Sequence, residues 1–379
     1  MPVQTTDELA PRGRVALGLL RETQPGERRV ALVPSDVKRL SASFDILAEE
    51  GAGARAGFSD GDYEAAGSRT VPVERIRGSA RVVVGIRAPF WATELAAGAT
   101  LLSLGGRDAS LTKLLTSAAI SHLGLERLPR VTRAQGMDVL SSQASIIGYA
   151  AVLEGAQHLP MILPMLTTAA GVIRPANVMV LGAGVAGLQA LATARRLGAV
   201  THGFDVRTAA REQVESVGAT FVAPDVVLAS TETTGGYARE QSKDEQKSLR
   251  RALSDHLRKM NLIITTAQIP GQPAPLLIDD ETLALLSPGT VIVDLAAESG
   301  GNTSRTLADQ EVLVGDVTIL GPTQLASRNA GDASRLFSGN IRQLLEHVGV
   351  KDGALQLNQS DPIVSALLGL LADGETGSP

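Results

Sequence analysis

Short β-rich runs alternate with helix-like segments along the first hundred residues of the chain. The runs Arg14–Leu20, Arg81–Ile86 and Ala99–Leu104 are strand candidates, and Ser35 is placed to cap the helix that follows it. Strands separated by helix-length segments pair in parallel, and their helices cover both faces of the sheet. This region of the chain therefore predicts an α/β domain.

A second α/β pattern follows a long helical segment at about 141–165, which is rich in small and apolar residues. The strand candidate Val178–Leu181 continues into glycines and the helix candidate Leu188–Leu197, and the next strand candidate is Val200–Val206. Three further apolar runs, near residues 261–267, 289–296 and 317–322, complete a parallel set. A last helical pattern at 333–348 precedes a tail that is expected to be weakly structured.

These patterns predict an α/β protein of two doubly wound Rossmann-like domains with a cleft between them, linked by long helices. The expected N-terminal-type domain is discontinuous and comprises residues 1–140 and 325–379. The expected nucleotide-binding domain comprises residues 141–324. The length of 379 residues agrees with two domains of ordinary size.

Composition narrows the possible chemistry. Hydrophobic residues make up 44% of the chain, and the absence of cysteine excludes thiol catalysis and thiolate metal sites. Acidic residues exceed basic ones by 40 − 35 = 5, so a nucleic-acid partner is not expected. The five histidines are widely spaced, so no metal is expected. The N-terminus does not resemble a signal peptide and no apolar run reaches the length of a membrane span, so a cytoplasmic location is expected.

Three glycines follow the second domain's first strand candidate in the spacing G-x-G-x-x-G, at Gly182, Gly184 and Gly187. In a dinucleotide-binding unit the first permits a tight turn, the second lets the backbone approach the pyrophosphate, and the third lets the helix pack on its strand. Asp205 ends the next strand 23 residues after Gly182, near the interval of about 20 at which an acid binds the ribose. The spacing and its context predict a dinucleotide site.

Asp205 also bears on the choice of cofactor. A carboxylate accepts hydrogen bonds from the ribose hydroxyls and repels a 2′-phosphate, so NAD(H) is the expected cofactor. Arg207 follows two residues later and leaves acceptance of a phosphate open. The alternative is an ordinary βαβ turn that binds no ligand.

Five strings in order along the chain resemble the alanine dehydrogenase and pyridine nucleotide transhydrogenase superfamily: RETQPGERRVALVPSDV, VMVLGAGVAGLQA, GFDVR, ITTAQIPGQPAP and VIVDLAAESGGN. The resemblance extends from about Val15 to about Val348. It implies that the cofactor is bound by the glycine turn, by the residues around the ribose-binding acid and by the start of the ITTAQIPGQPAP string: Gly182, Ala183, Gly184, Val185, Ala186, Gly187, Asp205, Val206, Arg207, Thr266, Ala267 and Gln268.

The segment PRVTRAQGMDVLSSQASIIGY, residues 129–149, is similar to the signature of the NAD(H)-binding subunit of proton-translocating transhydrogenases. The resemblance implies that four residues surround the nicotinamide ring and its ribose as the catalytic set: Arg130, Gln135, Asp138 and Ser141. Direct hydride transfer between two nicotinamides needs no acid–base group, because proximity and orientation carry the step. Without the resemblance, the segment indicates a helix N-terminus with a surface ion pair.

The string GGYARE, residues 235–240, resembles the mobile loop that closes over the nucleotide in such subunits. In that interpretation Tyr237 packs on the cofactor. A flexible loop with an exposed tyrosine is the alternative.

Two glycines depart from the superfamily pattern. An alanine dehydrogenase binds pyruvate with an arginine, a lysine and a catalytic histidine, and Arg29 occupies the arginine position in this chain, while Gly85 and Gly106 occupy the other two. Glu298 stands where that enzyme carries an aspartate. Charge stabilisation and proton transfer are both lost when glycines replace lysine and histidine, so alanine dehydrogenase activity is not expected. The same positions also differ from the usual transhydrogenase pattern, so Arg29, Arg107 and Glu298 remain candidates for binding another substrate.

The leading hypothesis is the NAD(H)-binding component of a proton-translocating NAD(P) transhydrogenase, which passes a hydride from NADH to NADP⁺ on a partner. The resemblance implies a homodimer, a membrane-embedded partner subunit carrying the NADP(H) domain, and a peripheral location at the inner face of the membrane. A second hypothesis is a free-standing NAD-dependent oxidoreductase acting on a small amino or oxo acid. A third is a non-catalytic NAD(H)-binding regulator.

Overall fold

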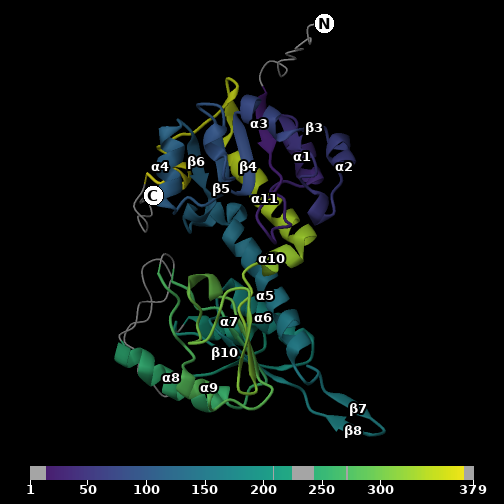
Figure 1. The fold of residues 1–379 in the computed structure, drawn as a ribbon, viewed down its shortest axis with the longest axis vertical. Helices are drawn as coiled ribbons and strands as arrows, with labels where there is room; N and C mark the ends of the chain where they lie inside the picture. Colours follow the sequence, from purple (N-terminus) through teal and green to yellow (C-terminus); the bar gives the residue numbers. More distant parts are fainter. Residues whose placement is uncertain (1–13, 208, 224–242, 270–271, 371–379) are drawn as a thin grey trace. The chain divides into compact units, whose positions relative to one another are not determined.

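The structure is a computed structural model that describes residues 14–207, 209–223, 243–269 and 272–370. The arrangement of the chain, shown in Figure 1, divides it into two compact units. Unit 1 comprises Met1–Gln143 and Ala326–Pro379, and unit 2 comprises Ala144–Leu325. The first boundary lies inside the long helix α5 (Val139–His158).

Unit 1 contains a six-stranded parallel sheet in the order β3-β2-β1-β4-β5-β6. This order, in which the chain starts in the middle and reverses direction once, is that of a doubly wound fold. The strands are β1 (Val15–Leu19), β2 (Phe44–Glu49), β3 (Arg69–Val71), β4 (Val82–Arg87), β5 (Thr100–Leu104) and β6 (Ser121–Gly124). The α-helices of this region are α1 (Pro34–Leu40), α2 (Asp60–Ala65), α3 (Val73–Ser79) and α4 (Ala109–Ser117). Its short 3₁₀-helical turns, labelled η, are η1 (Ala54–Ala56), η2 (Ala92–Glu94), η3 (Leu125–Arg127) and η4 (Thr132–Met137).

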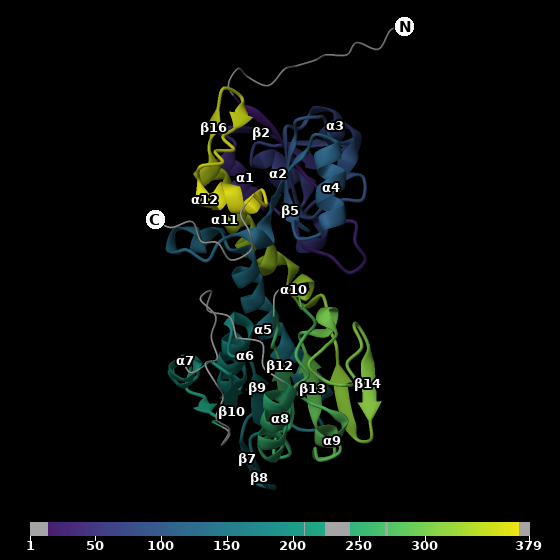
Figure 2. The ribbon, with the colours of Figure 1, turned by 90° about the vertical axis from the view of Figure 1, so that its left-hand side faces the viewer.

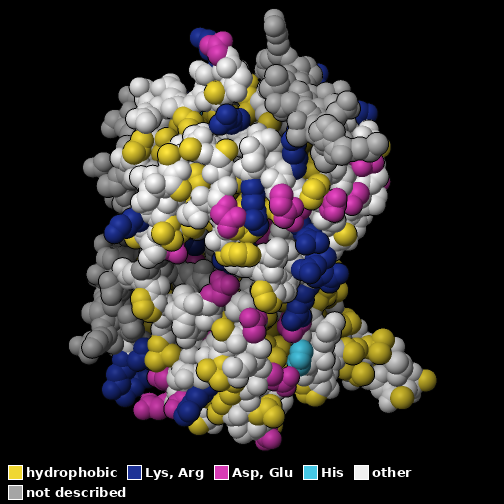
Figure 3. Space-filling view, turned by 45° about the horizontal axis from the view of Figure 1, so that its top comes forward, with side chains coloured by type: hydrophobic (Ala, Val, Ile, Leu, Met, Phe, Trp, Pro, Cys, Tyr) yellow, Lys and Arg dark blue, Asp and Glu magenta, His cyan; other side chains and the backbone are white. Residues whose placement is uncertain are grey.

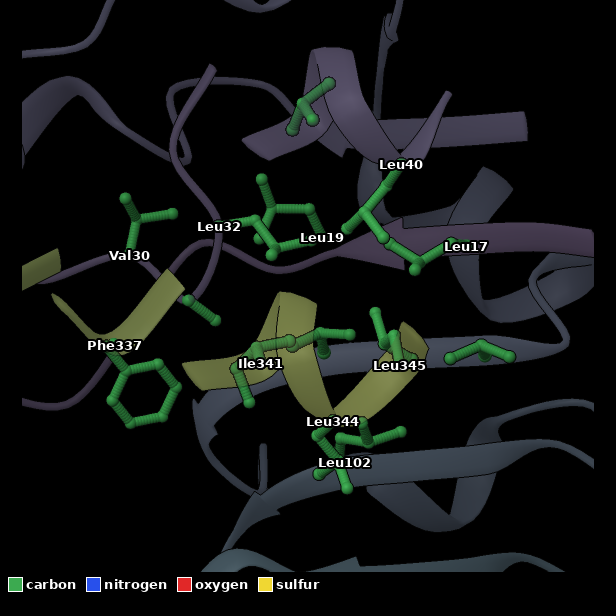
Figure 4. Packing of buried hydrophobic residues seen from close by; sticks show 14 of the residues in the cluster. Leu17, Leu19, Val30, Leu32, Leu40, Leu102, Phe337, Ile341, Leu344 and Leu345 are labelled. Atoms are coloured by element: carbon green, nitrogen blue, oxygen red, sulfur yellow. The ribbon is translucent and has the colours of Figure 1, made fainter. Parts of the chain in front are cut away.

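The C-terminal segment completes the core of unit 1. Helix α11 (Ala330–Val348) places Phe337, Ile341 and Leu344 in one cluster with Leu17 and Leu102 of the sheet, as Figure 4 shows. The hairpin β16 (Val350–Lys351) and β17 (Ala354–Leu355) leads to α12 (Pro362–Leu367), which buries three apolar side chains. The expected weakly structured tail is therefore wrong as far as residue 367, because burial of these side chains orders the segment.

Unit 2 contains a seven-stranded sheet in the order β11-β10-β9-β12-β13-β15-β14. All neighbours run parallel except the edge pair β14 and β15. The strands are β9 (Asn177–Leu181), β10 (Val200–Phe204), β11 (Thr220–Phe221), β12 (Leu262–Thr265), β13 (Val291–Asp294), β14 (Glu311–Val314) and β15 (Val317–Leu320). The helices are α6 (Val185–Arg196), α7 (Ala210–Ser216), α8 (Lys243–Leu257), α9 (Asp280–Leu283) and α10 (Leu325–Arg328), with the turn η5 (Ala297–Ser299).

Helices cover both faces of the unit 2 sheet. Residues of α5, α6 and α7 share one apolar cluster with the sheet, and residues of α8 and α9 share another. In Figure 2 α8 stands in front of the strands and α6 lies on the far side. The α/β fold class with doubly wound parallel sheets is confirmed.

Several local features differ from the sequence prediction, among them strands β2, β3, β6 and β11, which the pattern did not indicate. The segment expected to be helical to about residue 165 ends at His158, and an exposed hairpin of β7 (Leu166–Thr168) and β8 (Gly171–Ile173) follows. Strand β14 adds an antiparallel edge that the pattern did not indicate. Helix α1 begins at Pro34, and Val33 is its N-cap instead of Ser35, because proline is favoured at the first helical position. None of the helices in the described regions of the chain is long and apolar enough to cross a membrane.

Candidate functional site

The glycine turn lies where the strand order of the unit 2 sheet reverses. Strand β9 ends at Leu181 and its parallel neighbour β12 ends at Thr265, so their carboxyl ends open beside each other. In the sheet, β10 lies next to β9 and β13 lies next to β12, as seen in Figure 2. Ligands of open α/β sheets bind at this reversal point, outside the carboxyl ends of the strands.

Each of the three glycines meets a different environment. Gly182 has a φ of +104°, and a Cβ there would lie 2.4 Å from Thr266 Oγ1. A Cβ on Gly187 would lie 1.8 Å from the carbonyl oxygen of Gly182, so the helix packs on its own turn. A Cβ on Gly184 would meet open space. At Gly184, therefore, no neighbouring atom among the described residues excludes a side chain. The open space beside Gly184 is what a pyrophosphate requires.

Helix α6 begins immediately after Gly184, its N-cap, and extends for 12 residues. Its first-turn N–H groups point out of the turn together with the positive end of the helix dipole. Such a helix N-terminus binds phosphate groups. The turn and the helix together fit the pyrophosphate of a dinucleotide.

Asp205 lies directly after β10 and shapes the turn with both carboxylate oxygens. Oδ2 accepts the backbone N–H of Ala183 at 2.8 Å, and Oδ1 accepts the backbone N–H of Arg207 at 2.8 Å. The guanidinium of Arg207 donates to Oδ1 and Oδ2 at 3.0 and 2.9 Å. The structure thus brings the predicted ribose-binding acid to the glycine turn, with its charge balanced by the arginine that follows it.

The predicted residues Thr266, Ala267 and Gln268 form the segment after β12, on the other side of the turn. Thr266 Oγ1 donates to the carbonyl of Gly182 at 2.9 Å, and the amide of Gln268 donates to the carbonyl of Leu295 at 3.0 Å. Ala267 bonds through its own N–H and carbonyl to the side chain of Asn302. Thr266, Ala267 and Asp205 therefore lie around the same glycine turn.

Asn302 and Asp294 were not predicted from the sequence, and both belong to the hydrogen-bond network next to this turn. Both are fully buried, and Asp294 Oδ2 accepts the backbone N–H of Asn302 at 2.6 Å. Asn302 closes the string VIVDLAAESGGN, whose resemblance to the superfamily does not by itself give this asparagine a role. A single asparagine belongs to no motif that could be recognised in the sequence, because its hydrogen-bond partners are backbone groups that lie far away along the chain.

In unit 1, Asp138 and Ser141 form the N-terminal cap of α5. Asp138 accepts the backbone N–H of Ser141 at 3.0 Å and its hydroxyl at 2.5 Å. Gln135 is exposed in the turn η4 that precedes the helix, and Arg130 is exposed just before it. The four predicted nicotinamide residues thus belong to one short segment leading into α5.

Arg29 is engaged within unit 1. Its Nε and Nη2 donate to the two oxygens of Glu27 at 2.8 and 2.6 Å, and its Nη1 donates to Gln143 at 2.8 Å. Burial would raise the pKa of Glu27, but the hydrogen bonds and charge of Arg29 lower that pKa to about 2. All three guanidinium nitrogens are therefore committed to internal partners.

Gly85 faces a buried carboxyl group. A Cβ on Gly85 would lie 3.3 Å from Glu22 Oε1, which accepts the backbone N–H of Ile86 at 2.6 Å. Burial raises the pKa of Glu22 to about 7, and the negative charge of Glu27 adds to the rise against the lowering by backbone hydrogen bonds. A carboxyl group thus lies beside the position at which the sequence resemblance places the lysine of an alanine dehydrogenase.

Gly106 has no room for a side chain. A Cβ there would lie 2.5 Å from the Cα of Gly124, because the ends of β5 and β6 approach closely at this point. Arg127 Nε donates to the carbonyl of Gly106 at 2.7 Å and holds this arrangement. The position at which the sequence resemblance places the histidine of an alanine dehydrogenase is therefore closed by backbone contact.

Two further candidate substrate residues are separate from these contacts. Arg107 is exposed after β5 and donates its backbone N–H to Glu126 at 3.3 Å. Glu298 is exposed in the turn η5 of unit 2. Tyr237 lies outside the described residues.

Comparison with known proteins assigns the family. Residues 18–147 match the family described as "Alanine dehydrogenase/PNT, N-terminal domain", and residues 151–376 match "Alanine dehydrogenase/PNT, C-terminal domain". The chain belongs to the alanine dehydrogenase/PNT family.

The relatives of this family member include transhydrogenase subunits. The chain is 40% identical over 362 residues to the first segment of NAD(P) transhydrogenase subunit alpha of Rhodospirillum rubrum, covering 92% of this chain and 94% of that protein. It is 30% identical over 295 residues to the alanine dehydrogenase of Halomonas elongata, covering 74% and 72% of the two chains. The solved structure of a transhydrogenase from Sinorhizobium meliloti superposes with a TM-score of 0.79 at 38% identity, covering 88% of this chain and 93% of that one. The predicted resemblance is confirmed, and with it membership of a family of nicotinamide-nucleotide oxidoreductases.

Proposed function

We propose that this family member is the NAD(H)-binding component of a proton-translocating transhydrogenase, and that it passes a hydride from NADH to NADP⁺ on a partner subunit. The observation that carries the nucleotide-binding part of the proposal is the turn at Gly184, open above the start of α6 and flanked by Asp205. Identity of 40% to a transhydrogenase subunit over 92% of the chain supports the reaction class.

Unit 2 would bind the cofactor through its backbone. The N–H groups at the start of α6 would bind the pyrophosphate, and Asp205 would accept the adenosine ribose hydroxyls. A ribose can bind to the Asp205 carboxylate only when the guanidinium of Arg207 gives up at least one of its two hydrogen bonds to Asp205. The carboxylate disfavours a 2′-phosphate, so we propose NAD(H) as the resident nucleotide.

The catalytic contribution proposed for Arg130, Gln135, Asp138 and Ser141 is orientation. The nicotinamide itself supplies the hydride, and the polar groups of this segment would bind the ring's carboxamide and ribose. The Asp138–Ser141 cap fixes the backbone at the start of α5, so the side chains of these two residues are held before the nucleotide arrives. Positioning of this kind accelerates transfer without a proton donor.

The competing activity, a dehydrogenase acting on a small amino or oxo acid, lacks support at its key positions. Gly106 leaves no proton-transferring group at this position after β5, and insertion of a side chain there collides with Gly124. Arg29 is committed to Glu27 and Gln143. A non-catalytic NAD(H)-binding regulator would use the same unit 2 site and differs only in having no hydride acceptor.

We also propose a homodimer and a membrane-embedded partner subunit that carries the NADP(H) domain, with this chain peripheral at the inner membrane face. The hairpin β7–β8 supports self-association: its strands pair only with each other among the described residues, and Met165 and Val172 are 64% and 63% exposed. A two-stranded hairpin is marginal alone in water, and closed pairs of identical chains are the commonest oligomers. Figure 3 shows apolar side chains gathered on this arm at the lower right.

The test is to add the purified chain to washed membranes of its host and measure hydride transfer from NADH to an NADP⁺ analogue. Transfer that requires both components is the expected result. Tight NADH binding without transfer, for the chain alone and with membranes, would contradict the transhydrogenase assignment. A panel of oxo and amino acids would then distinguish the dehydrogenase from the regulator.

A further inference from the structure

We infer that Asn302 is a positioning residue of the nucleotide site, which keeps the segment after β12 in the shape that binds the cofactor. This inference rests on the proposed binding of NAD(H) at the glycine turn. It does not depend on the identity of the hydride acceptor.

The side chain of Asn302 bonds to three backbone groups from one buried position. Its Oδ1 accepts the N–H of Ala267 at 3.1 Å, and its Nδ2 donates to the carbonyls of Ala267 and Pro275 at 2.9 and 2.8 Å. One amide thus satisfies both polar backbone groups of Ala267. An amide is needed for this, because it alone among short side chains offers an acceptor and two donors in one plane.

Ala267 borders the glycine turn directly. Its N atom would lie 3.3 Å from a Cβ on Gly182, and its neighbour Thr266 donates to the Gly182 carbonyl. Movement of Ala267 therefore changes the wall of the turn on which the pyrophosphate is proposed to lie.

The backbone of Asn302 is itself fixed, which gives its side chain a definite place. The carboxylate of Asp294, at the end of β13, accepts the N–H groups of Asn302 and Thr303 at 2.6 and 3.2 Å. The carbonyl of Asn302 accepts the N–H groups of Leu277 and Ile278 at 2.8 and 3.0 Å. Asn302 therefore connects the end of β13 to the segment after β12.

Asn261 offers a matched control at the opposite end of the same strands. It directly precedes β12, and its Oδ1 accepts the backbone N–H of Asn177 at 2.8 Å. Both asparagines bond their side chains to backbone groups of unit 2, but only Asn302 borders the carboxyl ends where the cofactor is proposed to bind.

The experiment titrates the intact chain and its Asn302→Ala and Asn261→Ala variants with NADH, following nucleotide fluorescence, and records thermal unfolding of each. We expect both variants to lower the melting temperature and only Asn302→Ala to weaken NADH binding, by about tenfold, because two polar groups of Ala267 lose their partners. Asn302→Asp keeps the size of the side chain but faces two carbonyls with a carboxylate, so it should weaken binding at least as much.

Equal NADH affinity in the parent chain, in Asn302→Ala and in Asn302→Asp would overturn the inference, as would equal weakening by Asn261→Ala. Should Asn302→Ala fail to fold, the comparison passes to Asn302→Asp. A parent chain that binds no NADH would overturn the proposed nucleotide site as well. Binding that depends on Asn302 in a chain without membrane-dependent transfer would leave this inference standing and contradict only the transhydrogenase assignment.

Discussion

At the scale of single residues, Asp205 joins two tasks, because it shapes the glycine turn and is proposed to bind the ribose. Asp205→Ala should lower NADH affinity by about tenfold. It should also reduce the ratio of the affinity for NADH to the affinity for NADPH. This reduction is expected because Arg207 is released from its ion pair and the repulsion of a 2′-phosphate disappears.

Fluorescence titrations with both nucleotides measure this effect. Arg207→Ala is the control, since it leaves the carboxylate in place and should keep or increase the preference for NADH. An unchanged NADH-to-NADPH ratio in Asp205→Ala would argue against the assigned cofactor preference.

Glu22 makes the stability of unit 1 sensitive to pH. Burial raises its pKa from 4.5 to about 7, so the folded chain binds more protons than the unfolded chain between these values. The contribution of Glu22 to stability is then highest below about pH 4.5 and falls as pH rises towards about 7. Glu22→Gln should remove this fall and make the chain more stable than the parent at pH 8, by up to about 3 kcal/mol.

The free energy of urea unfolding at pH 5 and pH 8, measured for the parent chain and Glu22→Gln, tests the role of Glu22. Glu49→Gln serves for comparison, because it removes a second carboxyl group whose pKa is raised by burial. The advantage of Glu22→Gln should be several times smaller at pH 5 than at pH 8. Parallel pH profiles for the parent chain and Glu22→Gln would contradict a raised pKa of Glu22, because a pKa that is equal in the folded and unfolded chain gives no pH dependence.

At the scale of elements, two substitutions in the β9–α6 turn should have different effects, one on the stability of the chain and the other on NADH binding. Gly187→Ala places a methyl group 1.8 Å from the Gly182 carbonyl position, so we expect a loss of about 1–3 kcal/mol of stability. Gly184→Ala meets open space at a φ of −76° and should change stability by less than about 0.5 kcal/mol. Its methyl group would nevertheless occupy the path of the pyrophosphate and weaken NADH binding about tenfold.

Chemical unfolding and NADH titration of the same two variants check this separation. A Gly184→Ala variant that binds NADH normally would remove the main support for a phosphate site at this turn.

The C-terminal elements complete unit 1 through specific polar contacts. The hydroxyls of Ser334 and Ser338 on α11 accept the backbone N–H groups of Val30 and Val33 at 2.9 and 3.0 Å. Arg342 adds an ion pair with Asp36 at 3.0 Å. These contacts join segments that are far apart in sequence, which explains why this unit is discontinuous.

At the scale of the whole molecule, the β7–β8 hairpin is the surface on which the proposed dimer depends. Val172→Asp combined with Ile173→Asp should convert a dimer into a monomer, because two charges replace apolar side chains that a partner would bury. Sedimentation velocity measures the result. Leu313→Asp on β14 is the control, since Leu313 is 68% exposed but lies outside the hairpin. A parent chain that sediments as a monomer, or a dimer that survives both charges, would contradict the proposed interface.

The sequence by itself determined the α/β class, the central strands of both sheets and the glycine turn. These features depend on local periodicity and on short-range spacing, as in the run from Val178 through Gly187 to Asp205. Family membership was likewise visible in ordered strings, and the comparisons confirmed it.

The tertiary structure decided what depends on groups distant along the chain. The role of Asn302 arises from backbone atoms of Ala267 and Pro275, and the raised pKa of Glu22 arises from burial beside β4. The closed space at Gly106 exists because Gly124 of the neighbouring strand approaches it. Periodicity cannot report such contacts, since hydrogen bonding, desolvation and steric exclusion act between atoms that only folding brings together.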